Sequence, residues 1–189
     1  MNMSISKEEA QEALEMIQNI SNRTKTSIAN GGSDFMILWG IIWILGFTAS
    51  QYIDGSIVGY IWMGLSSSGG IISFFLGRRM GGQVKSPIGR LISLFWMAIF
   101  IFTIIAVILV IPRNDYTALS MMIITMVMFG YTIMGLFTNR FISFVGLFVT
   151  LMGLISYFVI PQYFGISMAV FGGGTLTLSG IYMQKKWKS

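Results

Sequence analysis

Residues 91–111 read LISLFWMAIFIFTIIAVILVI, an apolar stretch of 21 residues with no charged residue and no glycine. A helix needs about 20 such residues to cross the ~30 Å hydrocarbon core of a bilayer. Bulky apolar side chains occupy every face of this helix, so lipid suits it better than water does. Because it has no glycine and is bulky throughout, we expect it to face lipid more than its neighbours do.

Five further apolar stretches of similar length accompany this one. None of them contains a charged residue, and all are too long and too uniformly apolar for the strands of a barrel. They lie at about residues 35–53, 57–77, 117–137, 141–160 and 165–183. The sequence therefore predicts an all-α polytopic membrane protein with six transmembrane helices.

The composition agrees with lipid as the solvent and narrows the chemistry. Of the 189 residues, 54% are hydrophobic and 10% charged, against roughly 25% charged in a soluble domain. Cysteine and histidine are both absent, which excludes disulfides, thiolate metal sites and histidine bases. The fifteen methionines are either Cu(I) ligands or gap-filling apolar residues, and we favour gap filling. We assign no catalytic, cofactor-binding or metal-binding residue and expect no enzyme.

The basic residues predict the orientation in the membrane. All but Arg113 of the twelve lysines and arginines fall before the first span, in the second or fourth loop, or in the C-terminal tail. We expect a multi-pass protein of the cell membrane, and the positive-inside rule places these segments and both termini in the cytoplasm. The net charge of +5 is thereby explained by topology, and we expect no nucleic-acid partner.

The six spans also group into three hairpins, and the second helix of each carries small residues in mid-span. We expect these second helices to lie nearer the bundle centre, and the small residues to form helix interfaces or to line a polar cavity on a solute path. The candidates are Ser66, Ser67, Ser68, Gly69 and Gly70, then Gly130, Thr132 and Gly135, then Gly172, Gly173, Gly174 and Thr175. Stripes of small residues at Gly165, Ala169, Gly173 and Thr177, and at Ser143, Gly146, Thr150 and Gly153, favour helix interfaces.

The last hairpin contains Leu151-Met152-Gly153-Leu154, Ile160-Pro161 and Leu178-Ser179-Gly180-Ile181. This pattern resembles the HdeD-type acid-resistance membrane proteins, which are built from three tandem transmembrane hairpins. The resemblance covers roughly a quarter of the chain and implies the topology and a stress-related role. It implies no reaction.

Residues 1–33 are expected to be a cytoplasmic amphipathic helix and a linker, and residues 34–189 the six-helix bundle with a short basic tail. The helix is expected to end at Asn30-Gly31-Gly32, which is a typical helix stop, and Asp34 to cap the first span. Its apolar stripe needs a surface to cover it. The partner-binding candidates on that stripe are Ala10, Leu14, Ile17 and Ile20.

The second loop is basic and rich in glycine. Its charges either bind anionic lipid head groups or serve only to orient the chain, and we favour orientation. The head-group candidates are Arg78, Arg79, Lys85 and Arg90.

Together these features favour a non-enzymatic membrane protein that acts by binding a partner, with the lipid bilayer around it. The partner is another protein or a second copy of the chain. The alternative is a passive channel or small-solute transporter through a bundle lined by glycine and serine.

Overall fold

The computed structural model describes residues 7–53, 56–83, 87–110 and 115–188, which form helices and no strand. Within them are six helical spans long and apolar enough to cross a membrane, as the sequence predicts. The elements are α1 (Lys7–Tyr52), α2 (Ser56–Gln83), α3 (Pro87–Val110), α4 (Tyr116–Phe137), α5 (Arg140–Phe158), η1 (Pro161–Tyr163), α6 (Phe164–Ser167), η2 (Met168–Gly174) and α7 (Thr175–Lys188).

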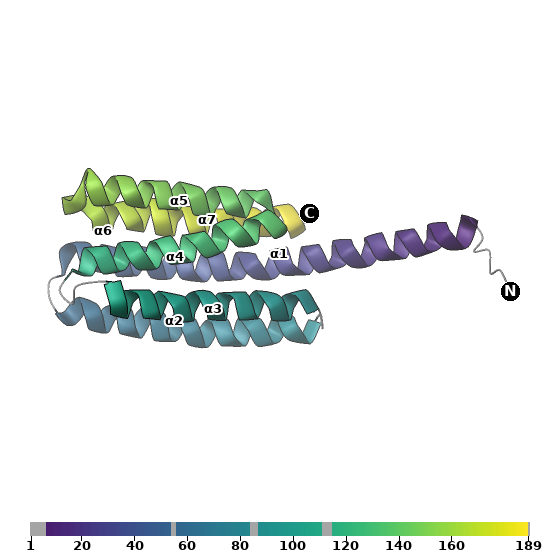
Figure 1. The fold of residues 1–189 in the computed structure, drawn as a ribbon, viewed down its shortest axis with the longest axis horizontal. Coiled ribbons are helices and arrows are strands. Elements are labelled where there is room, and N and C mark those ends of the chain that lie inside the picture. Colours follow the sequence, from purple (N-terminus) through teal and green to yellow (C-terminus); the bar gives the residue numbers. More distant parts are fainter. Residues whose placement is uncertain (1–6, 54–55, 84–86, 111–114, 189) are drawn as a thin grey trace.

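Helix α1 is the longest element and joins the N-terminal segment to the first span without interruption (Figure 1). The helix end predicted at Asn30-Gly31-Gly32 is therefore wrong. Once the span is helical, extending it backwards costs only the modest penalty of two glycines, whereas starting a separate helix requires a new nucleus. The N-cap predicted at Asp34 is wrong for the same reason, because Asp34 lies inside α1.

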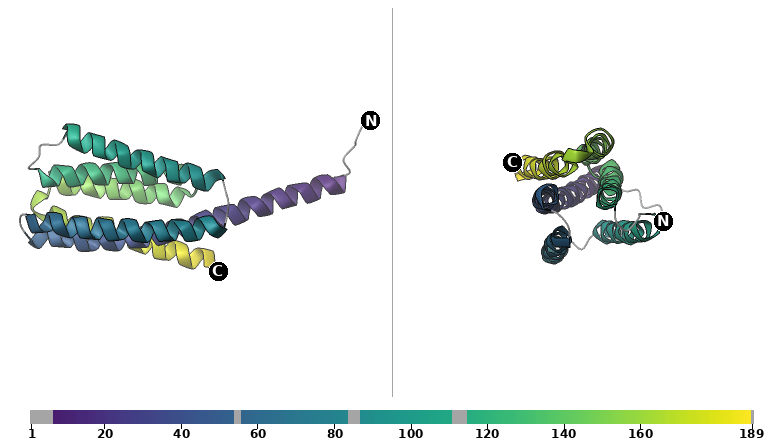
Figure 2. Two further views of the ribbon diagram at one scale, coloured as in Figure 1. Left: turned by 90° about the horizontal axis from the view of Figure 1, so that it is seen from below. Right: turned by 90° about the vertical axis from the view of Figure 1, so that its left-hand side faces the viewer.

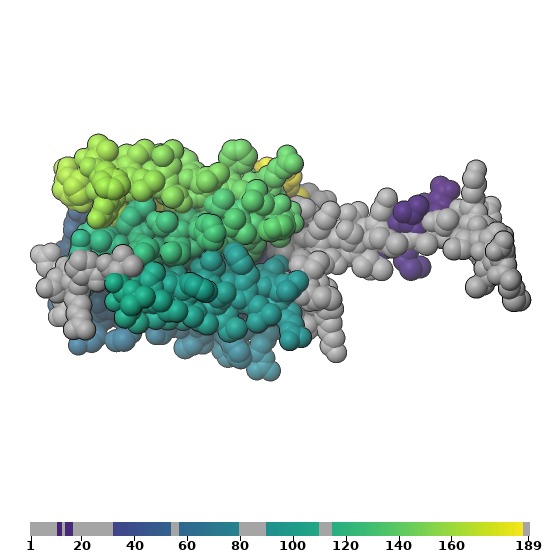
Figure 3. Space-filling model, viewed as in Figure 1, coloured from purple at the N-terminus to yellow at the C-terminus, as the bar shows by residue number. Residues whose placement is uncertain are grey.

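The N-terminal part of α1, residues 7–31, projects from the bundle, and we call it the stalk (Figure 1). The described side chains of the stalk lie well away from the bundle in the space-filling view, in purple (Figure 3). At a rise of 1.5 Å per residue, the 25 residues of the stalk extend about 37 Å beyond Gly32, where the span begins.

The bundle has an inner set of four helices and two outer helices (Figure 2). The most extensive contacts join α4 to α5 and α1 to η2 and α7, while α2 packs on α1 and α3 packs on α4. No part of the α3 span is buried inside the bundle, which agrees with the exposure expected for residues 91–111. The expectation that the second helix of every hairpin is the more central one is wrong for the first hairpin, where 39% of the α1 span but only 6% of the α2 span is buried.

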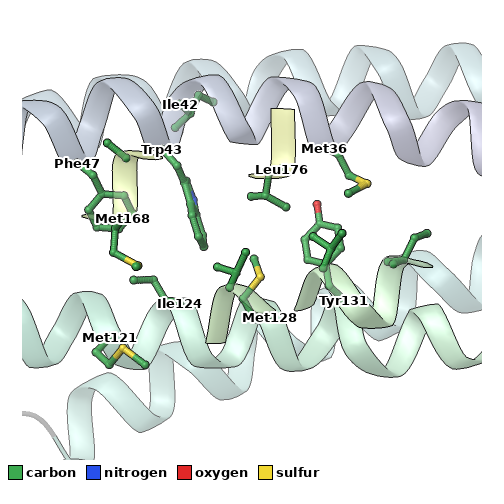
Figure 4. Close-up of a cluster of buried hydrophobic side chains, with 14 of the residues drawn as sticks. Met36, Ile42, Trp43, Phe47, Met121, Ile124, Met128, Tyr131, Met168 and Leu176 are labelled. Carbon is green, nitrogen blue, oxygen red and sulfur yellow. The ribbon is translucent and has the colours of Figure 1, made fainter. Parts of the chain in front are cut away.

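The core between the inner helices is rich in methionine (Figure 4). Met36 of α1, Met128 of α4 and Met168 of η2 are at most 1% exposed. Methionine is unbranched and flexible, so it fills the irregular gaps that aromatic rings leave. One such ring, that of Trp43, meets the ring of Phe47 edge to face at 5.6 Å between centroids.

The last span is divided into segments of different helical type. Pro161 opens the turn η1, and α6 follows it for a single helical turn. Then η2 is wound as a π-helix, in which hydrogen bonds join residues i and i+5 rather than i and i+4. Normal α-helix returns at Thr175.

Candidate functional site

The glycine cluster of the last span lies against α1. A Cβ atom on Gly173 would lie 2.7 Å from the carbonyl oxygen of Gly40, so no side chain fits there. A Cβ on Gly172 would lie 3.1 Å from the ring of Trp43. Gly174 has nothing nearer than 3.9 Å at that position, and Thr175 is half-buried. Close approach of the α1 backbone therefore accounts for Gly173, and the ring of Trp43 accounts for Gly172, whereas Gly174 has no such neighbour.

The same kind of contact continues along both helices. A Cβ on Gly165 would lie 2.8 Å from the carbonyl oxygen of Phe47, and one on Gly180 would lie 2.8 Å from that of Ser33. Together with Gly173, these positions form one row of glycines along the face of the last span that meets α1. We call this row the α1–α7 contact.

The cluster of α4 is divided between two neighbours. Gly130 is 3.1 Å from the ring of Trp96 on α3, measured from its ideal Cβ position. Thr132 and Gly135 face α5, where the Ser143 hydroxyl donates a 2.7 Å hydrogen bond to the Thr132 carbonyl. Hydrogen bonds of this kind commonly help to hold neighbouring helices together in membranes.

The cluster of α2 mostly lies outside the bundle. Only Gly69 is buried, beneath the end of the Ile42 side chain and the ring of Trp39 on α1. Ser66, Ser67, Ser68 and Gly70 are exposed. Ser68 donates its hydroxyl hydrogen to the Gly64 carbonyl at 2.7 Å, within its own helix. The three clusters thus lie at different interfaces and do not gather around one shared interior.

Two polar contacts that the sequence does not reveal join α1 to the last span. The side-chain amide of Gln184 donates to the carboxylate of Asp34, at the end of the bundle that carries the stalk. At the opposite end, Gln51 donates to the Gln162 carbonyl at 2.9 Å and accepts from the Ile166 amide at 3.1 Å. The second of these bonds satisfies an amide in the first turn of α6 that has no partner in its own helix.

The described basic residues of the bundle lie at the stalk end. Arg78, Arg79 and Arg90 are exposed there, and the guanidinium of Arg78 lies 5.7 Å from the ring centroid of Phe74. Lys85, the fourth head-group candidate, lies outside the described residues. The described head-group candidates are thus accessible at one end of the bundle.

On the stalk, Leu14 is 58% exposed and Met16 is 65% exposed. The side chains of Ala10, Ile17 and Ile20 lie outside the described part of the structure. Glu12 and Glu15 are also exposed. The described part of the stalk thus presents apolar and acidic groups together.

The side chains that most often bind metal ions do not cluster in the part of the chain that the structure describes. No three His, Cys, Asp or Glu side chains gather there. The sulfur atoms of Met121 and Met168 lie 3.2 and 3.7 Å from the ideal Cβ position of Gly153, so both side chains fill the space above that glycine. This arrangement is the gap filling that methionine commonly provides.

Comparison of the chain with models of protein families, with curated proteins and with solved structures found no match.

Proposed function

We propose that this chain is a non-enzymatic subunit of the cell membrane that binds a soluble cytoplasmic protein through its stalk. The observation that carries the proposal is the single helix α1, which is both a buried part of the bundle and the projecting stalk. A linker would leave the amphipathic segment free to fold back on the membrane. A continuous helix instead holds it at a fixed height and angle.

The charge of the stalk indicates the kind of partner. Glu8, Glu9, Glu12 and Glu15 lie in its outer half, and Glu15, the nearest to the bundle, is 17 residues before Gly32, or about 25 Å. That distance exceeds the ~8 Å over which charges interact at physiological salt. The basic residues at the end of the bundle therefore cannot neutralise these glutamates, and a partner with an apolar groove and a basic rim fits them.

A second copy of the chain fits the stalk less well. Two chains in one membrane with the same orientation would pair their stalks in parallel, which sets acidic half against acidic half. Like charges at such an interface are unfavourable. The stalk is therefore expected to bind a different protein.

The channel or transporter alternative has less support. Its lining was expected from the small-residue clusters, but Ser66, Ser67 and Gly70 are exposed on α2, and Gly173 lies against the backbone of α1. The resemblance of the last hairpin to HdeD-type proteins favours a stress-related setting for the partner.

The test is labelling of single cysteines, since the native chain has none. Leu14→Cys and Ile17→Cys lie on the apolar stripe, and Glu15→Cys, on the opposite face, is the matched control. In native membranes we expect a water-soluble maleimide to label positions 14 and 17 several-fold more slowly than position 15. After purification and reconstitution in lipid vesicles, the three rates should become equal.

Two results would contradict the proposal. Equal rates in native membranes would mean that nothing covers the stripe. Slow labelling that persists in the purified protein would mean that a second copy, or the bundle itself, covers it.

A further inference from the structure

Serine and threonine hydroxyls in the spans commonly form a hydrogen bond with a carbonyl of their own helix. Each donates to the carbonyl four residues earlier, as is usual for serine and threonine in an apolar setting. The residues that do so are Ser50, Ser68, Thr103, Ser120, Thr125, Thr132, Thr138, Thr150, Ser156 and Thr177. Against this background, a buried hydroxyl without a partner calls for an explanation.

Tyr131 of α4 carries such a hydroxyl. The residue is 5% exposed, and its ring meets the ring of Trp96 edge to face at 5.3 Å between centroids. A rigid phenol cannot bend back to its own helix, and its hydroxyl has no hydrogen-bond partner among the residues that the structure describes. Buried tyrosines usually find a partner for this group.

The surroundings of this hydroxyl are apolar. Its oxygen points towards α1, between Leu176 and Met36 (Figure 4). Leu176 is 0% exposed and Met36 1% exposed. The phenol oxygen is therefore shielded from bulk solvent by packed side chains.

Ser179 of α7 is a second buried hydroxyl, 7% exposed, without a hydrogen-bond partner among the described residues. Cross-helix contacts place it at a similar depth to Tyr131. Helix α5 meets α7 where the rings of Phe141 and Tyr182 lie 5.3 Å apart, and it meets α4 where Gly146 touches Thr132. Counting about 1.5 Å per residue from these two contacts brings Tyr131 and Ser179 to within about one helical turn in depth.

We infer that the core between α1, α4 and α7 contains a binding site for one water molecule, held by the hydroxyl of Tyr131 with that of Ser179 as a second anchor. The ligand must be small because the walls are packed side chains. It must be neutral because no charged side chain is buried with it in the described core. It must form hydrogen bonds because two hydroxyl groups are otherwise left unsatisfied, and buried water commonly serves such groups.

The first test is the sign of a change in thermal stability. If water bonds the phenol, Tyr131→Phe removes a satisfied hydrogen bond, and we expect the Tm of the purified protein to fall by about 2–4 °C. If the phenol is unsatisfied, the same substitution relieves a penalty and leaves Tm unchanged or higher, which would overturn the inference. Tyr182→Phe, which removes a hydroxyl from a ring that is 51% exposed, is the control and should leave Tm unchanged.

The second test identifies the ligand by infrared difference spectroscopy. Exchange of the solvent into H₂¹⁸O should shift a bound-water O–H band that the Tyr131→Phe variant lacks. The Met36→Leu variant should retain that band. A bonded phenol band that ignores ¹⁸O and disappears in Met36→Leu would show that the thioether of Met36 is the acceptor, and it would contradict the water site.

Discussion

Helix α1 packs against two neighbours in different ways. Against η2 and α7, glycine meets backbone, and a Cβ at Gly173 or Gly180 would lie 2.7–2.8 Å from a carbonyl oxygen of α1. Against α2, glycine instead meets a large side chain, as where Gly46 lies beneath the ring of Trp62. The first arrangement leaves no room for movement of side chains, whereas the second can adjust by changing a rotamer.

The difference shows that the number of glycines in a span does not decide how tightly it packs. Helix α2 is rich in glycine, yet a Cβ at Gly59, Gly64, Gly70 or Gly77 would meet nothing within 4 Å. What matters is whether the glycine faces the backbone of another helix.

The largest effect is expected at the α1–α7 contact. Gly173→Leu places a side chain where the backbone of α1 already lies, and backbone cannot move aside as a side chain can. We expect a loss of about 3 kcal/mol or more, enough to prevent recovery of a folded bundle in detergent. Gly70→Leu on α2 is the matched control and should give a well-folded protein. If both variants fold equally well, the contrast between the two interfaces fails.

A smaller effect is expected from emptying the core. Leu176→Ala removes a side chain that is 0% exposed and leaves a cavity among packed neighbours. We expect a cost of about 2–4 kcal/mol, seen as a lower midpoint of unfolding in sodium dodecyl sulfate. Ile108→Ala on α3, where the side chain is 74% exposed, should change the midpoint little. A comparable drop in the α3 variant would mean that the outer helices contribute to a shared core.

The α1–α2 contact should tolerate substitution better. Gly69→Leu meets the end of the Ile42 side chain and the ring of Trp39, both of which can change rotamer. We expect a cost of about 1–2 kcal/mol in the same unfolding assay, larger than that of Ile104→Ala. Gly64→Leu, five residues earlier in the same helix and in open space, is the control. A loss as severe as that of Gly173→Leu would show that α2 is as tightly packed as α7.

The smallest effect is expected at Gln51, which joins α1 to the turn before α6. Gln51→Leu removes the hydrogen bonds to the Gln162 carbonyl and the Ile166 amide, and we expect a cost of about 1 kcal/mol. Gln162→Leu keeps its own carbonyl and should have almost no effect on the midpoint. Equal losses would show that the Gln162 side chain, and not its backbone, matters at this turn.

Much of the fold follows from hydropathy, because a span without charges has no stable place except lipid or a core. The row Gly165, Gly173 and Thr177 could also be predicted from the sequence, since a spacing of four residues keeps a row on one face of a helix. The role of the run Ser66–Gly70 could not be predicted in this way, because five consecutive small residues cover every face and do not reveal that only Gly69 is buried.

Other features depend on contacts between distant parts of the chain. Asp34 and Gln184 are 150 positions apart, and neither neighbourhood suggests the other. Helix α1 continues through Gly31 and Gly32 because the transmembrane span that follows them is already helical. The local sequence contains only the two glycines, which on their own predict a helix end. The lack of a hydrogen-bond partner for the Tyr131 hydroxyl likewise depends on the residues packed around it and not on its own segment.

The π-helix η2 has a consequence for how this protein tolerates insertions and deletions. A π turn takes in one residue more than an α turn, so the extra residue is absorbed between Met168 and Gly174 and the helix resumes in phase at Thr175. A deletion of Gly174, whose ideal Cβ has only one neighbour within 4 Å, would convert the segment towards α-helix while the residues from Thr175 onwards kept their faces. Elsewhere in the span, loss of one residue would turn every later side chain by about 100°. Among sequences related by descent, this short segment is therefore where a change in the length of the span would be expected to survive.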